Sequence, residues 1–249
     1  MRLRIVTPIT APDFGTEAIE EIRLAARPDA CIEHVRIDAG PASIEGAYDE
    51  ALAVPDTVRK IVEAERDGVQ GVLINCMGDP GLYPARERVG IPVLGPFQTA
   101  AHVAAMIGHR FSVVTVLDSV VPTFWQNAAV YGVAGRMASV RSVDIPVLDL
   151  EADTERMVRR LVAESALAVR EDGADTVIFG CTGMTGVADR VRAGLLAAGF
   201  DVPVIDPMPV SLKILEAVVE GRLSQSRRAF MTPRPKACPG YADLAGVAE

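Results

Sequence analysis

The sequence is poor in the features that mark nucleic-acid-binding, membrane and secreted proteins. Aromatic residues make up 5% of its 249 residues, and 25 basic residues against 33 acidic ones give a net charge of −8. Nucleic acid would find neither a strong basic cluster nor much stacking surface, so it is not expected as a partner. No apolar run approaches the roughly 20 residues of a membrane-spanning helix. The N-terminal MRLRIVTPIT enters a strand pattern directly, without a signal-peptide cleavage region, which favours the cytoplasm.

Cysteine and histidine are also scarce, which argues against a disulfide framework and a metal enzyme. Four cysteines in a chain of this length are expected to be free thiols in a reducing compartment. The three histidines, His34, His102 and His109, share no metal-ligand spacing with one another or with the cysteines. We therefore expect no metal and no cofactor.

Apolar segments of strand length alternate with helical patterns along the chain. The expected strands are 3–10, 31–38, 69–76 and 91–96, and then 110–119, 137–144, 174–181 and 202–207. Such alternation predicts parallel sheets covered by helices. The sequence thus predicts an α/β fold with two pseudosymmetric lobes, each a parallel sheet flanked by helices. The first lobe would comprise residues 1–96 plus 208–249 and the second residues 97–207, with the active site between them.

Two connections carry specific expectations. The segment 40–55 is predicted to be a long linker in which Pro55 interrupts any helix, and a helix is expected from Asp56 to about Asp67. The segment 208–223 is predicted to return as a helix that packs on the first lobe, and the tail from Ser224 is predicted to be loop.

The strongest pattern is a motif that occurs twice, as VLINCMGDPG (72–81) and VIFGCTGMTG (177–186). Each copy is an apolar run, then a cysteine, then a glycine-containing turn. An Asp-Gly pair precedes each cysteine, with Gly68 and Gly173 each eight positions before it. Matching element order and near-equal spacing indicate an internal duplication, in which Cys76 and Cys181 occupy equivalent positions.

The two cysteines are candidates for acid/base chemistry. Ligands of open α/β sheets bind beyond the carboxyl ends of the strands, where Cys76 and Cys181 are predicted to lie. We expect helix N-termini there to lower the pKa of both thiols, and Gly78 and Gly183 to leave backbone N–H groups free for an anionic ligand. A thiolate on one side of a carbon would remove the proton alpha to a carbonyl, and a thiol on the other side would return one. That reaction is a racemisation.

A single cysteine in an apolar strand is more often a small buried hydrophobe than a catalyst. This interpretation is preferred for Cys31, and Cys238 in the tail is interpreted as an incidental thiol. The repeated context favours the functional interpretation for Cys76 and Cys181 as a pair.

The sequence resembles the aspartate/glutamate/hydantoin racemase superfamily, and most closely its hydantoin racemase branch. The resemblance implies a two-lobed α/β fold and a cofactor-independent mechanism with Cys76 and Cys181 as the two bases. It also implies that Met77, Gly78, Thr115, Thr182 and Gly183 line the substrate site. The segments that carry it are GPASIEGAYDEAL (40–52), GVLINCMGDPGLYPARE (71–87), IPVLGP (91–96), RFSVVTVLDSVVP (110–122), VLDLE (147–151) and EDGADTVIFGCTGM (171–184).

Several positions depart from the family pattern. The first strand ends in Thr7-Pro8-Ile9-Thr10 where hydantoin racemases usually have an Asn-Pro-Asn-Thr-like motif, so Ile9 should make the pocket more apolar. Met77 replaces a common phenylalanine, and Thr182 a common alanine. The related arylmalonate decarboxylases keep only the second cysteine, so Cys76 argues against that activity.

The preferred hypothesis is a racemase of 5-substituted hydantoins or of a related cyclic ureide such as allantoin. One alternative is a racemase of a free amino acid such as aspartate or glutamate, and another is a two-lobed protein that binds a small ligand without catalysis. A redox pair is a further alternative, but a disulfide needs Cα atoms within about 7 Å, which leaves no room for a substrate. The expected partners are a small-molecule substrate and further copies of the chain, because the composition is apolar and the helices are rich in alanine.

Overall fold

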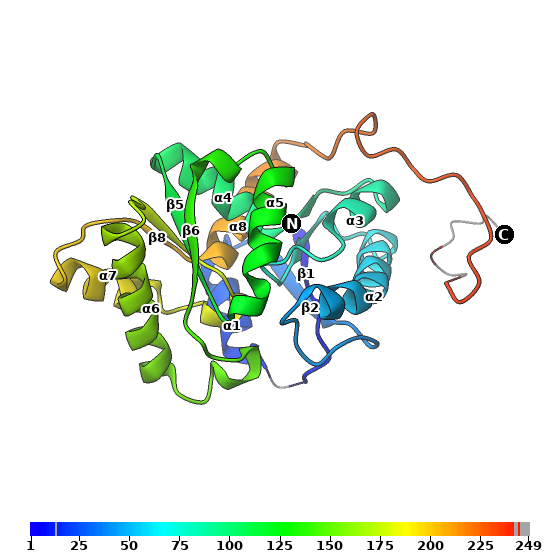
Figure 1. Ribbon diagram of the computed structural model, residues 1–249. Coiled ribbons are helices and arrows are strands. Elements are labelled where there is room, and N and C mark those ends of the chain that lie inside the picture. Colours follow the sequence, from blue (N-terminus) through cyan, green and yellow to red (C-terminus); the bar gives the residue numbers. More distant parts are fainter. Residues whose placement is uncertain (13, 242–243, 245–249) are drawn as a thin grey trace.

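A computed structural model describes residues 1–12, 14–241 and 244, which form two four-stranded parallel sheets flanked by helices (Figure 1). The strand orders are β2-β1-β3-β4 and β6-β5-β7-β8, so equivalent strands of the two cycles hold equivalent places. The predicted fold class is confirmed. The strands are β1 (Arg2–Thr7), β2 (Cys31–Arg36), β3 (Gly71–Ile74), β4 (Val93–Leu94), β5 (Phe111–Thr115), β6 (Met137–Ser142), β7 (Thr176–Phe179) and β8 (Val204–Ile205).

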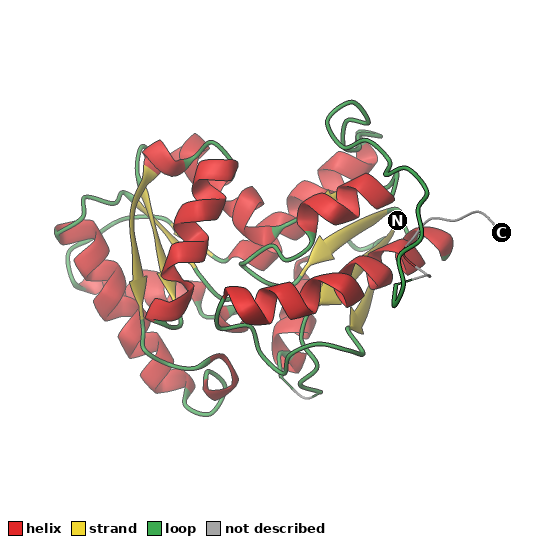
Figure 2. Cartoon of the chain, turned by 45° about the vertical axis from the view of Figure 1, so that its right-hand side comes forward, coloured by secondary structure: helices red, strands yellow, loops and turns green. Residues whose placement is uncertain are grey.

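Both faces of each sheet are covered, as the near-continuous apolar strands require. Helices α1 and α8 cover one face of the first sheet, and α2 and α3 cover the other. The second sheet lies between the pair α4 and α5 and the pair α6 and α7 (Figure 2). The helices are α1 (Thr16–Ala25), α2 (Ala47–Arg66), α3 (Leu82–Arg88), α4 (Pro96–Ile107), α5 (Val121–Val130), α6 (Thr154–Arg170), α7 (Ala188–Ala197) and α8 (Pro207–Glu220), with 3₁₀ turns η1 (Asp118–Val120), η2 (Ala134–Arg136), η3 (Val147–Asp149) and η4 (Thr182–Met184).

The helix that follows each closing strand crosses to the other sheet. Met208, Leu212 and Leu215 of α8 are fully buried against strands β1 and β3. Conversely, Phe97 and Ala100 of α4 are buried against strands of the second sheet. Each large apolar side chain buried in this way contributes about 1.5–3 kcal/mol. The expectation that 208–223 packs on the first lobe is confirmed, whereas the lobe boundaries 1–96 plus 208–249 and 97–207 remain predictions.

The expectation that Pro55 interrupts the helix is wrong. Helix α2 begins at Ala47 and runs through Pro55 to Arg66. A proline inside a helix removes one backbone hydrogen bond and strains the preceding turn. Here the helix also buries Val58, Ile61 and Val62 against the first sheet, and this packing outweighs the loss. Residues 47–55 therefore belong to helix α2 and not to a linker.

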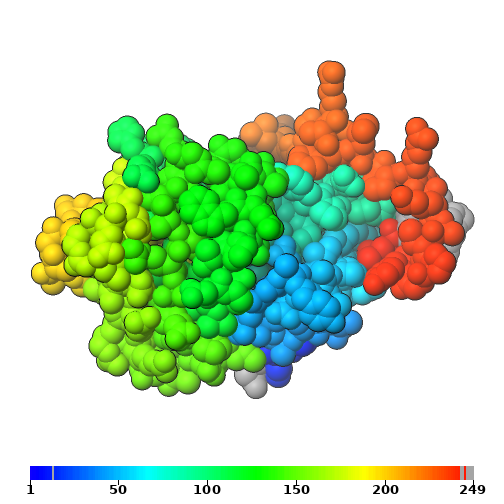
Figure 3. All heavy atoms as spheres, viewed as in Figure 1, coloured from blue at the N-terminus to red at the C-terminus, as the bar shows by residue number. Residues whose placement is uncertain are grey.

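The C-terminal tail lies on the first lobe, as its orange and red atoms show in Figure 3. The tail has no regular strand or helix between Gly221 and Tyr241, which agrees with the expected loop. Gln225 donates hydrogen bonds to the carbonyls of Val89 and Ile91, at 2.7 and 2.9 Å. These bonds fix the start of the tail beside the C-terminal end of α3.

Candidate active site

A pocket lies at the carboxyl ends of the strands of both sheets, and it brings together all eight residues singled out from the sequence. Cys76, Met77 and Gly78 follow β3, and Cys181, Thr182 and Gly183 follow β7. Ile9 comes from the segment after β1, and Thr115 is the last residue of β5. The remaining lining residues are Thr7, Phe14, Gly15, Ala18, Ile44, Gly46, Glu50, Asn75, Val116, Val120, Thr123, Phe124, Val147 and Gly180.

The two cysteines sit in equivalent turns. The N–H of Asp79 donates to the carbonyl of Cys76 at 3.0 Å, and the N–H of Met184 donates to that of Cys181 at 3.1 Å. The amide of Gly183 also donates to the sulfur of Cys181 at 3.4 Å, and Gly78 makes the corresponding bond to Cys76. The expectation that these two glycine amides are free for a ligand is therefore wrong, because each is already bonded to a sulfur.

The expected lowering of the cysteine pKa values is also wrong. Burial raises the pKa of Cys181 to about 11 and raises that of Cys76 further. In each case the hydrogen bond from the glycine amide lowers the pKa, but loss of solvation is larger. The Cys181 charge adds to the upward shift at Cys76, so the two sulfurs interact electrostatically. Neither cysteine forms a disulfide bond.

A hydrogen-bonded chain fixes the wall of the pocket beside Cys76. The amide Nδ2 of Asn75 donates to Oγ1 of Thr7 at 3.0 Å, and that hydroxyl lies 2.8 Å from Nε2 of His34. Burial and the nearby Arg36 and Arg23 charges lower the pKa of His34 to about 4, so its ring is neutral and shares a hydrogen bond with the Thr7 hydroxyl. His34 thus orients Thr7 without adding a positive charge to the pocket.

In the second lobe, the residue before the cysteine makes different contacts. Gly180 precedes Cys181 as Asn75 precedes Cys76, and the hydroxyl of Thr115 donates to the Gly180 carbonyl at 3.1 Å. One bond also joins the lobes, because Oγ1 of Thr182 donates to the carbonyl of Asn75 at 3.3 Å. The residues beside the two cysteines are therefore tied to one another.

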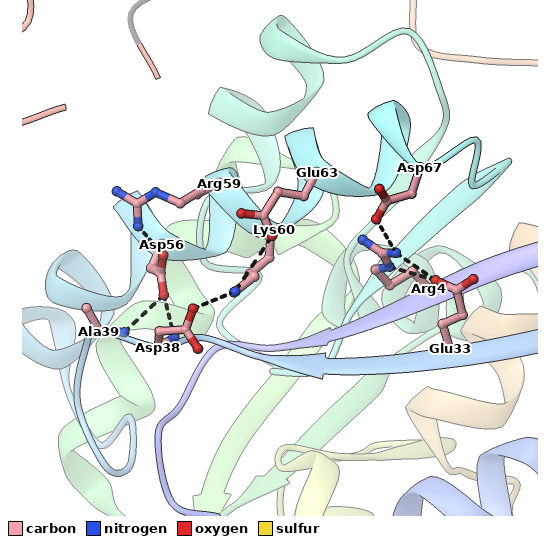
Figure 4. Close-up of polar contacts among 9 residues, drawn as sticks. All are labelled: Arg4, Glu33, Asp38, Ala39, Asp56, Arg59, Lys60, Glu63 and Asp67. Carbon is pink, nitrogen blue, oxygen red and sulfur yellow. Dashed lines mark hydrogen bonds and ion pairs between the residues drawn. The ribbon is translucent and has the colours of Figure 1, made fainter. Parts of the chain in front are cut away.

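The loop between β2 and α2 forms another wall, which the sequence did not indicate. It brings Ile44 and Gly46 to the pocket. The carboxylate of Asp56, which is 2% exposed, accepts hydrogen bonds from the backbone amides of Asp38 and Ala39 (Figure 4). This contact anchors the start of the loop to α2.

The end of the same loop reaches the second lobe. Oε1 of Glu45 accepts a hydrogen bond from the backbone amide of Val147 at 2.8 Å, and Ser119 donates to the Glu45 carbonyl at 2.6 Å. The first turn of α2 then places Glu50 in the pocket. The predicted linker over 40–55 did not identify Glu50 as a site residue, although the spacing of Ala47, Glu50 and Ala51 fits a helix face.

Asp79 connects the Cys76 turn to α4. Its carboxyl, in a residue that is 4% exposed, accepts hydrogen bonds from the amides of Phe97 and Gln98 at 3.0 and 2.9 Å and from the Tyr131 hydroxyl at 2.9 Å. It occupies the space that a side chain on Gly95 would fill. Burial raises the pKa of Asp79 to about 7 despite these donors.

The start of α8 is capped by the residue directly before the helix, and not by a distant one as in α4. Asp206 accepts hydrogen bonds from the amides of Gly186 and Met208, at 2.8 and 3.3 Å. It stands immediately before α8, as Gly95 stands before α4. The two lobes therefore place a carboxylate at the same point from different sequence positions.

Among the described lining residues there is no lysine, arginine or histidine, and only Glu50 carries a carboxyl group. Arg86 does not line the pocket: it donates to the Val93 carbonyl at 3.0 Å and to Gln98 at 2.8 Å. Within residues 1–12, 14–241 and 244, no three histidine, cysteine, aspartate or glutamate side chains are grouped to hold a metal ion.

Comparison with known proteins gives full-length matches. Residues 4–215 match the family described as Asp/Glu/Hydantoin racemase. A hydantoin racemase from Rhizobium meliloti is 36% identical over 242 residues, covering 97% of this chain and 98% of that protein. An allantoin racemase structure from Klebsiella pneumoniae has a TM-score of 0.89 at 31% identity, covering 99% of this chain and 100% of the other. An allantoin racemase structure from Pseudomonas fluorescens has a TM-score of 0.88 at 32% identity, covering 96% and 99%.

Proposed function

The chain belongs to the Asp/Glu/Hydantoin racemase family and is a racemase; on that premise we propose that its substrate is a 5-substituted hydantoin or allantoin. The proposed reaction inverts C5 of the ring without a cofactor, and Cys76 and Cys181 are the two bases. One observation carries this proposal. The two cysteines lie in equivalent turns that follow two separate sheets, and they line one pocket whose described residues include no cationic side chain.

The reaction needs only proton transfers at one carbon. The C5–H bond of a hydantoin lies next to a ring carbonyl, so removal of the proton gives an enolate. A thiolate at one cysteine takes the C5 proton and becomes a thiol. The thiol of the other cysteine then gives its proton to the opposite face of C5 and becomes a thiolate. The product is the mirror image, and the enzyme is left with the roles of the cysteines exchanged.

The composition of the pocket favours a neutral ring over a free amino acid. Aspartate and glutamate carry two carboxylates, and arginine and lysine side chains are the usual partners of buried carboxylates. Among the described lining residues there are none, and the Glu50 carboxyl would repel an anion. A hydantoin or allantoin ring offers N–H donors and carbonyl acceptors instead. The apolar Ile9, Met77 and Phe124 suit the carbon skeleton of a 5-substituent.

The test is polarimetry of enantiopure 5-benzylhydantoin, and separately of allantoin, with the purified protein in D₂O, followed by NMR at C5. We expect loss of rotation together with replacement of the C5 proton by deuterium. Cys76→Ser and Cys181→Ser should each abolish inversion while leaving the fold intact by circular dichroism. Unchanged rotation and an unchanged C5 proton for both compounds would refute the proposed substrates. Free aspartate and glutamate would then be assayed in the same way.

We further propose that the enzyme works in the cytoplasm and self-associates. Among the described residues, no helix is long and apolar enough to cross a membrane. The neighbouring helices α4 and α5 expose Met106, Ile107, Trp125 and Val130, which form apolar surface that another copy could cover. Light scattering measures the mass directly, and a value near 26.5 kDa would show a monomer.

A further inference from the structure

Glu50 stands between the active-site pocket and a second hollow on the outside of the molecule. It lines the pocket that contains both cysteines. It also lines a hollow bounded by the Cys76 turn, the start of α3 and the end of α5, where Tyr83 and Val130 are exposed to solvent. Gly78 borders both spaces as well. A group at this position touches substrate space on one side and reaches bulk water through the hollow on the other.

The glycine between Glu50 and Cys76 keeps these two side chains close. A Cβ atom on Gly78 would lie 3.3 Å from Oε2 of Glu50 and 3.8 Å from the sulfur of Cys76. Both atoms therefore lie within 4 Å of one point that carries no side chain. The Glu50 charge acts on Cys76, whose pKa it raises. The two atoms are therefore at most about 7 Å apart, and a proton can pass between them through one bridging water molecule.

The Glu50 carboxyl is not engaged in holding the fold together. Across the described chain it accepts no hydrogen bond and forms no ion pair. Burial alone raises the pKa of this carboxyl group toward neutral pH, where a group can both accept and release a proton. By contrast, the neighbouring Glu45 carboxylate is occupied by the amide of Val147.

We propose that Glu50 is the proton relay that connects Cys76 with solvent. This inference rests on the proposed racemase function, which leaves the two cysteines with exchanged protonation states after each turnover. To reset Cys76, its S–H proton passes to the Glu50 carboxylate, which becomes a carboxylic acid and then releases the proton to water in the outer hollow. Protonation of a Cys76 thiolate follows the same path in reverse. Only S–H and O–H bonds form and break.

The relay predicts a defect on one face of the substrate only. In D₂O, a thiol that exchanges quickly between turnovers delivers deuterium to the next substrate molecule. In Glu50→Gln the amide neither accepts nor releases a proton, so a proton that Cys76 has taken stays on its sulfur. Cys76 then returns protium to the next molecule of opposite hand. The enantiomer protonated by Cys76 should gain deuterium at least threefold more slowly than its mirror image.

The experiment uses racemic, protiated 5-benzylhydantoin in D₂O, with chiral chromatography and mass spectrometry to follow deuterium in each enantiomer. Wild type should label both enantiomers at equal rates. Glu65→Gln is the matched control, since it makes the same chemical change in a carboxylate of the same helix that already accepts hydrogen bonds from the amides of Gly90 and Ile91 and does not line the pocket. It should keep the two rates equal. Glu50→Ala with added acetate is a second variant, in which a small carboxylate should restore labelling on the Cys76 face.

The outcomes separate the relay from the function on which it rests. Equal labelling of both enantiomers by Glu50→Gln would overturn the relay. If the KM also rose, Glu50 would be only a substrate contact. If Glu50→Gln labels neither enantiomer, the Glu50→Ala variant is the decisive test. Failure of acetate to restore labelling of the enantiomer that Cys76 protonates would then overturn the relay. No exchange by wild type, or inversion that survives Cys76→Ser, would instead refute the proposed function.

Discussion

Replacing Gly180 by alanine would place a methyl group against the backbone of the neighbouring strand. The new Cβ would lie 2.5 Å from Cβ and 2.7 Å from Cα of Thr115. Carbon atoms in ordinary contact are about 3.5–4.0 Å apart, so β5 and β7 would have to separate by about 1 Å. Two bonds at this point would stretch, from the Gly180 amide to the Val114 carbonyl at 2.7 Å and from the Thr115 hydroxyl to the Gly180 carbonyl at 3.1 Å.

The cost follows from these two effects. Overpacking costs about 1–3 kcal/mol and each weakened hydrogen bond about 1 kcal/mol, which gives a loss of about 3–5 kcal/mol in the free energy of unfolding. Cys181, the next residue, would shift with the strand end, and a displacement of about 1 Å lowers a rate on the order of 100-fold. Urea unfolding measures the first effect and C5 exchange in D₂O measures the second.

Gly135→Ala is the control for this change, because a Cβ at Gly135 meets no atom within 4 Å. It should alter stability by less than about 0.5 kcal/mol and leave exchange unchanged. If Gly180→Ala lost less than about 1 kcal/mol and kept its activity, the close approach of the two strands beside Cys181 would not constrain the site.

The remaining predictions concern the contacts around the two cysteines. Because the folded pKa of His34, about 4, is below its ordinary value of 6.5, its contribution to stability is complete above pH 6.5 and is lost as the pH falls toward 4. After discounting for solvent screening this amounts to about 1–2 kcal/mol, and His34→Gln should flatten that part of a urea-unfolding profile against pH; an unchanged slope would contradict it. Thr182→Val removes the bond to the Asn75 carbonyl and should cost about 1 kcal/mol, whereas Thr182→Ser should restore it; equal stability of the three proteins would count against a link between the lobes. Asp79→Ala leaves the first amides of α4 without their acceptor and should lower the free energy of unfolding by about 2 kcal/mol; a loss below about 0.5 kcal/mol would rule out this capping role.

The sequence was informative where local pattern decides the structure. The repeated apolar runs place both cysteines after central strands, and the structure brings all eight predicted site residues to one pocket. Their roles stay predictions. The beginning of α2 was missed because Pro55 is a local signal, whereas the burial of Val58 and Ile61 that keeps the helix continuous depends on a sheet formed elsewhere in the chain.

The cysteine pKa values were predicted in the wrong direction for a similar reason. A sequence shows the glycine turn after Cys76 and Cys181, and such a turn does lower each pKa through one amide. It does not show how much water the finished pocket excludes, and this exclusion sets the sign. Glu50 was missed together with α2, because its place beside Cys76 results from the packing of a helix.

The carboxylates at the starts of α4 and α8 show how the two halves of the chain reach one arrangement with different residues. One half keeps the acid next to its helix at Asp206, and the other supplies it from Asp79 into the space left by Gly95. Both halves thus cap the helix with a carboxyl group, but in the first half the residue that supplies it lies 16 positions before Gly95. When the two halves are aligned, Asp206 therefore pairs with Gly95, although both halves place a carboxyl group at the start of the helix. Relatives that carry Asp at 95 and a small residue at 79 would be functional equivalents of this arrangement, and substitutions at these two positions should be accepted only together.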